Sequence, residues 1–394
     1  MISNEMVKLG TKRSVIRELF EYGKKRAAEI GAENVYDFSI GNPNVPAPEC
    51  VKETIMELLS STDPAILHGY TSAQGDVEVR TAIADYINER FNTTLTPNHI
   101  YMTVGAAASL CISLKALATE GDEFITFAPF FPEYRVFVQS VGAQLKVVPV
   151  NTDNFQIDFE NFKALLSPKT KGVIINSPNN PSGVVYSEET IKELCTILEE
   201  KSAEYGHPIY LISDEPYREI VYDGITVPYT MNYYKNTLVC YSYSKALSLP
   251  GERIGYIAVS DQMENSNDVY AAVCGAGRAL GYVCAPSLFQ KVIAKCVKAT
   301  SDINAYKENR DILYNGLSKL GYNCVRPDGA FYLFVQALEE DANAFCEKAK
   351  KYELLLVPGD DFGCPGYVRI SYCVKQSQIV DSLPAFEKLI AEYK

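Results

Sequence analysis

The chain has 394 residues, with 37 lysines and arginines against 49 aspartates and glutamates, which gives a formal net charge of −12. That length predicts two or three domains with a sizeable core. The negative charge argues against nucleic acid as a ligand, because binding to a phosphate backbone depends on clustered positive charge. Small molecules are the expected partners.

The residue usage narrows the chemistry and the compartment. With only three histidines, we expect neither a metal site nor acid–base catalysis by imidazole groups. The 11 cysteines are scattered without a C-x-x-C pair, which is typical of reduced thiols and predicts a cytoplasmic protein. Since no run approaches about 18 apolar residues, we expect no membrane span.

Short runs rich in β-branched and aromatic residues predict buried strands in the larger part of the chain. These strands are expected at residues 123–127, 172–176, 209–213, 237–241 and 255–259. Apolar residues at helical spacing predict a helix over residues 187–205. Near-continuous apolar strands separated by helices indicate an α/β domain with a parallel sheet.

The C-terminal part of the sequence has a different pattern. It predicts one helix across residues 286–320, strands at 330–335 and 367–373, and amphipathic helices at 341–351 and 376–392. This order indicates a smaller α+β domain, with a boundary near residues 285–290.

The strongest chemical signal lies just after the predicted strand 237–241. Lys245 follows that strand, with hydroxyl groups at Ser242 and Ser244, mostly apolar neighbours, and Arg253 eight residues further on. Such surroundings lower the pKa of an amine and make it a nucleophile. A solvated loop lysine is the alternative, and the context disfavours it.

Two further segments follow the ends of predicted strands. Ser213-Asp-Glu-Pro-Tyr217 lies at the carboxyl end of strand 209–213, where open α/β sheets bind their ligands. A helix cap and a packed tyrosine are an equally good interpretation of this segment alone. Asn179-Asn-Pro-Ser-Gly183 follows strand 172–176, and alone it would be an ordinary turn.

Together and in this order, these segments resemble the fold-type-I, class I/II aminotransferases that depend on pyridoxal phosphate, the family of aspartate, aromatic and alanine aminotransferases. The resemblance runs from Gly41-Asn-Pro-Asn44 to Val368-Arg-Ile-Ser-Tyr372. It implies a large domain over residues 45–285 with a mostly parallel seven-stranded sheet. A smaller α+β domain would combine residues 1–44 and 286–394.

The resemblance implies that three residues are catalytic. Lys245 would hold the cofactor as a Schiff base and then move the proton at the substrate Cα. Asp214 would keep the pyridine nitrogen protonated, so that the ring acts as an electron sink. Tyr217, together with Asn180, would hydrogen-bond the 3′-oxygen of the ring.

The resemblance also implies a phosphate site. Arg253 and Ser242 would bind the phosphate with a guanidinium fork and a hydroxyl group. The start of a helix at Gly105, Ala106 and Ala107 would add backbone N–H groups.

Two aromatic residues complete the expected cofactor site. Phe131 would stack on the ring, and Phe130 is the competing choice. Tyr70 matches the tyrosine that reaches the phosphate from the neighbouring subunit, which implies a homodimer with shared active sites. A buried turn tyrosine is the alternative for Tyr70.

The substrate site is expected around Arg369, which matches the arginine that clamps the α-carboxylate, with contacts from Gly41 and Asn180. An edge-strand ion pair is the alternative for Arg369. A distal carboxylate would need a second cation, for which Arg278 and Arg17 are candidates, each with a surface ion pair as the alternative. The amino acid donor therefore stays open.

The activity that this resemblance implies is transfer of an amino group from an L-amino acid to a 2-oxo acid such as 2-oxoglutarate. One pocket would serve both substrates in turn, which gives ping-pong kinetics. Aspartate-type and aromatic-type donors are the candidates. A cysteine-S-conjugate β-lyase on the same scaffold is the alternative, because both reactions begin when Lys245 abstracts the Cα proton.

Overall fold

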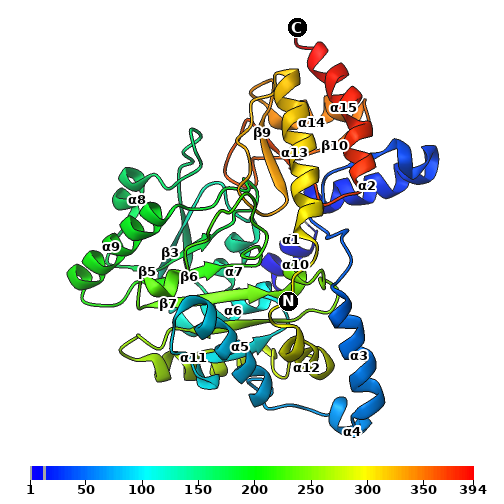
Figure 1. Cartoon of the computed structure of the whole chain (residues 1–394). Coiled ribbons are helices and arrows are strands. Elements are labelled where there is room, and N and C mark those ends of the chain that lie inside the picture. Colours follow the sequence, from blue (N-terminus) through cyan, green and yellow to red (C-terminus); the bar gives the residue numbers. More distant parts are fainter. Residues whose placement is uncertain (1, 12–14) are drawn as a thin grey trace.

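A mostly parallel sheet organises the larger part of the computed structural model, which describes residues 2–11 and 15–394 (Figure 1). Within those residues the sheet has seven strands in the order β2-β8-β7-β6-β5-β3-β4. Its strands are β2 (Ile100–Thr103), β3 (Glu123–Phe127), β4 (Gln144–Val148), β5 (Thr170–Asn176), β6 (Tyr210–Asp214), β7 (Thr237–Ser242) and β8 (Gly255–Val259). Strand β8 runs antiparallel to both of its neighbours, β2 and β7, and all the other neighbouring strands of this sheet pair in parallel. The predicted α/β fold is confirmed.

The strands predicted from the apolar runs are present in the structure at nearly the same residues. The bounds of β3 and β8 coincide with the prediction, while β6 and β7 each extend one residue further, to Asp214 and Ser242. All residues of β3, β7 and β8 are buried, as expected for strands covered on both faces. Because β6 and β7 are parallel neighbours, Asp214 and Ser242 lie at the same edge of the sheet.

Helices cover both faces of this sheet. Successive residues of β5 alternate between two cores, since Val173 packs with Leu194 of α9 (Glu188–Tyr205) and Ile174 packs with Leu114 of α6 (Ala106–Leu117). Ser187 caps α9 by accepting a hydrogen bond from the Thr190 amide at 3.1 Å, so the predicted helix 187–205 is confirmed. The other helices of this part are α3 (Glu49–Ser61), α4 (Pro64–Leu67), α5 (Val77–Phe91), α7 (Glu133–Ser140), α8 (Phe159–Leu165), α10 (Tyr243–Ala246), α11 (Ser266–Leu280) and α12 (Ser287–Cys296), with short 3₁₀ turns at Pro97–His99 and Thr230–Asn232.

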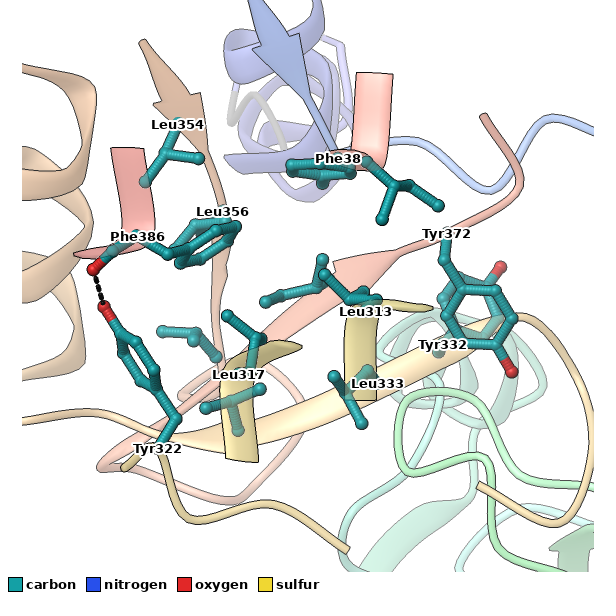
Figure 2. Close-up of a cluster of buried hydrophobic side chains, with 14 of the residues drawn as sticks. Phe38, Leu313, Leu317, Tyr322, Tyr332, Leu333, Leu354, Leu356, Tyr372 and Phe386 are labelled. Carbon is teal, nitrogen blue, oxygen red and sulfur yellow. Dashed lines mark hydrogen bonds between the residues drawn. The ribbon is translucent and has the colours of Figure 1, made fainter. Parts of the chain in front are cut away.

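The C-terminal part forms a second core, which joins both ends of the chain. Its elements are α13 (Ile303–Leu320), β9 (Tyr332–Gln336), α14 (Ala342–Lys350), β10 (Leu354–Leu355), β11 (Val357–Pro358), β12 (Tyr367–Ser371) and α15 (Gln376–Ala391). Strands β11, β12 and β9 form an antiparallel sheet with β12 in the centre. Figure 2 shows its core, in which Phe38 from the N-terminal segment lies near Leu313, Leu333 and Phe386. We name this cluster the C-terminal core.

The N-terminal segment contributes two helices, α1 (Asn4–Thr11) and α2 (Val15–Ile30), a 3₁₀ turn at Ala32–Asn34 and strand β1 (Tyr36–Asp37). Strand β1 pairs in parallel with β10, so this segment belongs with the C-terminal part. Within residues 2–11 and 15–394, no helix combines the length and the apolar character needed to cross a bilayer.

The single helix predicted across residues 286–320 is wrong, because α12 and α13 are separate. Asp302 begins α13 by accepting a hydrogen bond from the Asn304 amide at 3.0 Å. Val292 and Ile293 of α12 pack against α3 and α5, whereas Leu313 of α13 packs in the C-terminal core. The division into domains stays a prediction. This packing favours a boundary at residues 297–302, rather than near residues 285–290.

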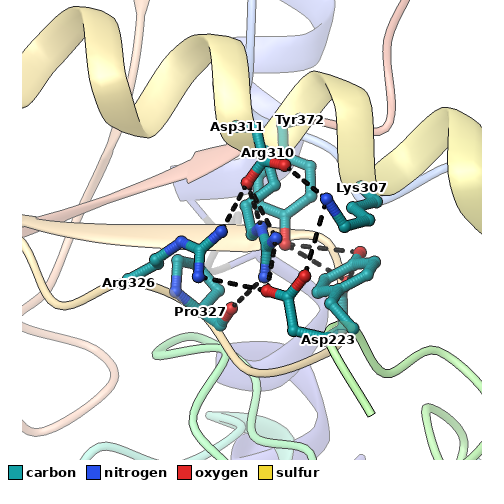
Figure 3. A network of polar contacts seen from close by, with 9 residues as sticks. Asp223, Lys307, Arg310, Asp311, Arg326, Pro327 and Tyr372 are labelled. Carbon is teal, nitrogen blue, oxygen red and sulfur yellow. Dashed lines mark hydrogen bonds and ion pairs between the residues drawn. The ribbon is translucent and has the colours of Figure 1, made fainter. Parts of the chain in front are cut away.

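A buried arginine links the C-terminal part to the sheet (Figure 3). Arg310 of α13 is 1% exposed and pairs with Asp223, in the loop after β6, at 2.8 Å and with Asp311 at 2.7 Å. Arg326 and Lys307 add ion pairs to the same two carboxylates. A buried guanidinium needs such partners, so the network fixes α13 against that loop.

Candidate active site

A cavity of about 320 Å³ opens where β5, β6 and β7 end. Asn176, Asp214 and Ser242, the last residues of these three strands, all line it. This edge is where ligands bind in open α/β sheets. The cavity also brings together most of the residues expected from the sequence: Gly41, Ala106, Ala107, Phe131, Asn180, Tyr217, Lys245, Arg253 and Arg369.

Lys245 lies on α10, the short helix that follows β7, and its amine points across the cavity. Its Nζ donates a hydrogen bond to the carbonyl oxygen of Gly41 at 2.6 Å. Burial lowers the pKa of Lys245 to about 8, and the positive charges of Arg369 and Arg253 act in the same direction. About one tenth of this amine is therefore neutral and nucleophilic at pH 7, far more than for an exposed lysine.

Asp214 ends β6 with its carboxylate in the cavity. The hydroxyl of Tyr134, on α7, donates a hydrogen bond to Asp214 Oδ2 at 2.6 Å. Oδ1 is buried and has no hydrogen-bond partner among the described residues. Burial raises the pKa of Asp214 to about 7. A partnerless buried carboxylate oxygen is costly and marks the place of a donor from a bound molecule.

The turn after β5 is held by its own asparagines. Asn179 Oδ1 accepts hydrogen bonds from the amide and hydroxyl of Ser182 at 3.0 and 2.8 Å. Asn176 Oδ1 accepts one from the Asn180 amide at 2.8 Å. These bonds leave the Asn180 side chain free to face the cavity, where its Oδ1 accepts a hydrogen bond from Arg369 at 3.0 Å.

Arg369 is a buried cation without a carboxylate partner among the described residues. It is 2% exposed on the central strand β12, and its second donor reaches the Ser39 carbonyl at 2.6 Å. Its Nε has no partner in the described chain, and its guanidinium lies 4.7 Å from the Tyr332 ring and 5.1 Å from the Phe362 ring. The edge-strand ion pair considered from the sequence is wrong. An unpaired buried guanidinium is suited to a carboxylate ligand.

A second corner of the cavity carries an arginine, two hydroxyl groups and the start of α6. Arg253, with φ at 51°, donates to Ser244 Oγ at 3.3 Å, and Ser242 Oγ lies 2.8 Å from Ser244 Oγ. Gly105 precedes α6 with φ at 96°, and a Cβ there would lie 2.7 Å from Arg253 Nη2. Only glycine leaves that space open, and the first N–H groups of α6 complete an anion site.

The structure distinguishes the two phenylalanines that the sequence offered for stacking, Phe131 and Phe130. Phe131 lines the cavity, with its ring edge-on to Tyr134 at 5.7 Å. Phe130 is buried in the sheet core beneath the guanidinium of Arg135. Phe131 is therefore the residue placed to stack on a ring in the cavity.

Tyr70 is 99% exposed and does not line this chain's cavity, so the buried turn tyrosine considered from the sequence is wrong. Arg17 and Arg278 are also exposed, and neither lines the cavity.

Sequence reasoning missed Tyr332, Tyr134 and Asn176, which contact the predicted residues directly. Tyr332 lies on β9 among buried apolar residues. Because a buried tyrosine hydroxyl needs a polar partner, its presence in this run could have indicated a contact with the site. Tyr134 lies on α7, three residues after Phe131, and nothing comparable in the sequence indicates its role.

Comparison with known proteins identifies the family. Residues 33–383 match the description "Aminotransferase class I and II". The chain belongs to the class I and II aminotransferases. An aminotransferase from Eubacterium rectale of known structure is 64% identical, with a TM-score of 0.98 and complete coverage of both chains. The aspartate aminotransferase of Thermotoga maritima is 30% identical over 93% of this chain and 94% of its own, and its structure superposes with a TM-score of 0.88.

A further relative of this aminotransferase is the aromatic-amino-acid aminotransferase 2 of Thermococcus litoralis, 27% identical over 97% of this chain and 96% of its own. The family depends on pyridoxal phosphate, and amino-group transfer is the activity that these relatives support for the protein. The β-lyase alternative is not favoured.

Proposed function

We propose that this aminotransferase binds pyridoxal phosphate in the described cavity and transfers an amino group from an L-amino acid to a 2-oxo acid such as 2-oxoglutarate. The observation that carries the proposal is the buried Asp214 Oδ1, which has no partner among the described residues. A protonated pyridine nitrogen is the donor that would satisfy it. When bound, the cofactor supplies an electron sink for the charge that develops at the substrate Cα.

The remaining residues of the cavity fit the same molecule. The corner of Arg253, Ser242 and the α6 N-terminus suits a phosphate, because it combines a cation, a hydroxyl and backbone N–H groups. Tyr217 and Asn180 line the same cavity, and each carries a group that can donate to a ring oxygen. Phe131 supplies an aromatic face.

Lys245 and Arg369 divide the work on the substrate. Arg369 binds the α-carboxylate with its planar fork and places Cα near Lys245. The neutral amine of Lys245 then takes the Cα proton and returns it at a later step. Because one carboxylate site serves the amino acid and the 2-oxo acid, the two substrates bind in turn.

The proposal includes a homodimer. Tyr70 is too exposed to act in its own cavity, which supports its role in the site of a second copy. A cytoplasmic location stays a prediction.

The donor is proposed from the relatives, whose names include aspartate and aromatic amino acids. If the donor is acidic, its distal carboxylate would need a cation. Arg278 and Arg17 stay the candidates, and because neither lines this chain's cavity, either would have to move to it or act from a second copy.

The test is a screen of the amino acids as donors against 2-oxoglutarate, with glutamate formation as the readout. Purified protein should be yellow, and Lys245→Ala should lose both the visible absorbance and the turnover. Release of ammonia and a 2-oxo acid without any acceptor would instead support elimination and contradict the proposal.

A further inference from the structure

Tyr332 connects two side chains that the proposed function assigns to different molecules. Its hydroxyl oxygen lies 2.9 Å from that of Tyr217, which follows β6. Its ring lies 4.7 Å from the guanidinium of Arg369, on the neighbouring strand β12. Tyr332 is buried and lines the cavity, so it contacts the cofactor side and the substrate side at once.

The ring of Tyr332 is held from three directions. It packs edge-on against Tyr217 at 5.7 Å with an interplanar angle of 82°. Arg369 covers one side, and the backbone of Gly41 lies against the hydroxyl, since a Cβ added at Gly41 would overlap it. Strand β9 fixes the backbone through its pairing with β12, in which Tyr332 faces Ser371. Because the ring is held in this way, the hydroxyl oxygen of Tyr332 is fixed in one position, within hydrogen-bond distance of the Tyr217 hydroxyl.

Either hydroxyl can be the donor in this pair, and a ring oxygen that accepts from Tyr217 would leave Tyr332 as the donor to Tyr217. Burial raises the pKa of Tyr332 to about 12 and that of Tyr217 well above its ordinary value, so both hydroxyls keep their protons near neutral pH. If Tyr332 donates to Tyr217, the proton of Tyr217 is left for another acceptor. A chain of donors strengthens each of its bonds.

We propose that Tyr332 is a positioning residue, which aims the Tyr217 hydroxyl at the cofactor's ring oxygen and holds the Arg369 guanidinium flat for the substrate carboxylate. This inference rests on the proposed function. It gives the C-terminal core a direct part in cofactor chemistry, because Tyr332 is a member of that core.

The test separates the hydroxyl from the ring by measuring the pH midpoint of the visible absorbance of the bound cofactor. A donor to the ring oxygen stabilises the form in which that oxygen is most negative, and so lowers the midpoint. Tyr332→Phe should raise the midpoint by about half a unit to one unit, the equivalent of one hydrogen bond. Its KM for amino acids should stay within about twofold, since the ring remains under Arg369.

Tyr332→Leu should raise KM about fivefold as well, because it also removes the cation–π contact. The matched control is Tyr222→Phe, which removes a buried hydroxyl that bonds the Ala330 carbonyl and does not line the cavity. It should leave both the midpoint and KM unchanged. A second control is Tyr217→Phe, in which adding Tyr332→Phe should produce no further shift.

The charged and titratable groups near Tyr217 and Lys245 are present in all these variants, and Tyr332→Phe removes a hydroxyl without removing any of them. These groups are Asp214, Arg253, Arg369 and Cys373. Thermal unfolding shows whether Tyr332→Leu folds, and Tyr332→Phe carries the test if it does not.

Two results would overturn the inference while leaving the proposed function intact. One is a yellow Tyr332→Phe protein with the wild-type midpoint, and the other is an equally large shift in the Tyr217→Phe background. A wild-type protein that takes up no pyridoxal phosphate would overturn the proposed function, and this inference with it.

Discussion

The hydroxyl of Tyr134 donates to one carboxylate oxygen of Asp214 at 2.6 Å, and the other oxygen is buried without a partner among the described residues. A single donor from the protein does not offset the loss of water around a charge. The carboxylate is therefore poorly stabilised until a second donor arrives. This arrangement weakens the empty protein and favours a cationic ring in the cavity.

Asp214→Asn should make the cofactor-free protein more stable relative to wild type as the pH rises. In the wild type, burial raises the pKa of Asp214 from 3.8 to about 7. The folded state then holds a proton that the unfolded chain releases between these values, so Asp214 lowers wild-type stability as pH rises through that window. The difference in unfolding free energy between variant and wild type should grow by roughly 2 to 3 kcal/mol from pH 5 to pH 7.

Denaturant unfolding of both proteins at several pH values measures this difference. Asp223→Asn is the control. Arg310 lowers the pKa of Asp223, so its charge stabilises the folded state above pH 4, and the variant should be less stable than wild type by an amount that does not change from pH 5 to pH 7. A difference for Asp214→Asn that does not change with pH would contradict the argument. The same variant should lose most of its turnover.

The uptake of pyridoxal phosphate by the cofactor-free protein should speed up with pH and level off above about 8. Only the neutral amine of Lys245 reacts, and burial lowers its pKa from 10.5 to about 8. Stopped-flow absorbance at a series of pH values measures the rate. A rate that continues to rise about tenfold per pH unit beyond pH 9 would mean that Lys245 keeps the pKa of an exposed lysine.

Arg369→Ala should raise KM for amino acids about 30-fold or more, the effect of losing hydrogen bonds to a charged group. Arg369→Lys keeps the charge without the planar fork, so its KM should fall between those of the wild type and Arg369→Ala. Steady-state kinetics with one donor and saturating 2-oxoglutarate measure both. An unchanged KM in both variants would place the carboxylate site elsewhere in the cavity.

Mixing Tyr70→Ala and Lys245→Ala subunits should restore activity that neither variant has alone. If Tyr70 acts in the site of the second copy, a hybrid dimer contains one site with both residues intact. Random reassociation should then give up to about one quarter of wild-type activity. A mixture no more active than the average of its parents would show that each site is complete within one chain.

The sequence predicted the parts of the site that lie on continuous motifs. Lys245, Asp214 and Asn180 each follow a buried strand, and parallel strands bring their carboxyl ends to one edge. Their placement in one cavity needed no knowledge of distant contacts. The strands themselves were predictable because short, continuous apolar runs are typical of strands that are buried on both faces of a parallel sheet.

The residues that the sequence did not reveal act through contacts between distant segments. Tyr332 is separated from Tyr217 by 115 positions, and Tyr134 from Asp214 by 80. In the sequence Tyr332 stands among apolar neighbours, which is equally typical of a core, and Tyr134 stands between Glu133 and Arg135, which is equally typical of a surface helix. The break between α12 and α13 was missed for a similar reason, since the two helices pack against different cores and periodicity alone does not show which.

The N-terminal segment makes its main contacts with residues far along the chain. In the pairing of β1 with β10, Tyr36 lies opposite Leu354. Lys245 donates a hydrogen bond to the Gly41 carbonyl, and Arg369 donates one to the Ser39 carbonyl. During synthesis the N-terminal segment must therefore wait for almost the whole chain before its partners exist. The seven-stranded sheet ends at Val259 and can form earlier, as domains fold in order from the N-terminus. The active site is completed last, when β12 has left the ribosome, so a truncated chain can have a folded sheet and still bind no substrate.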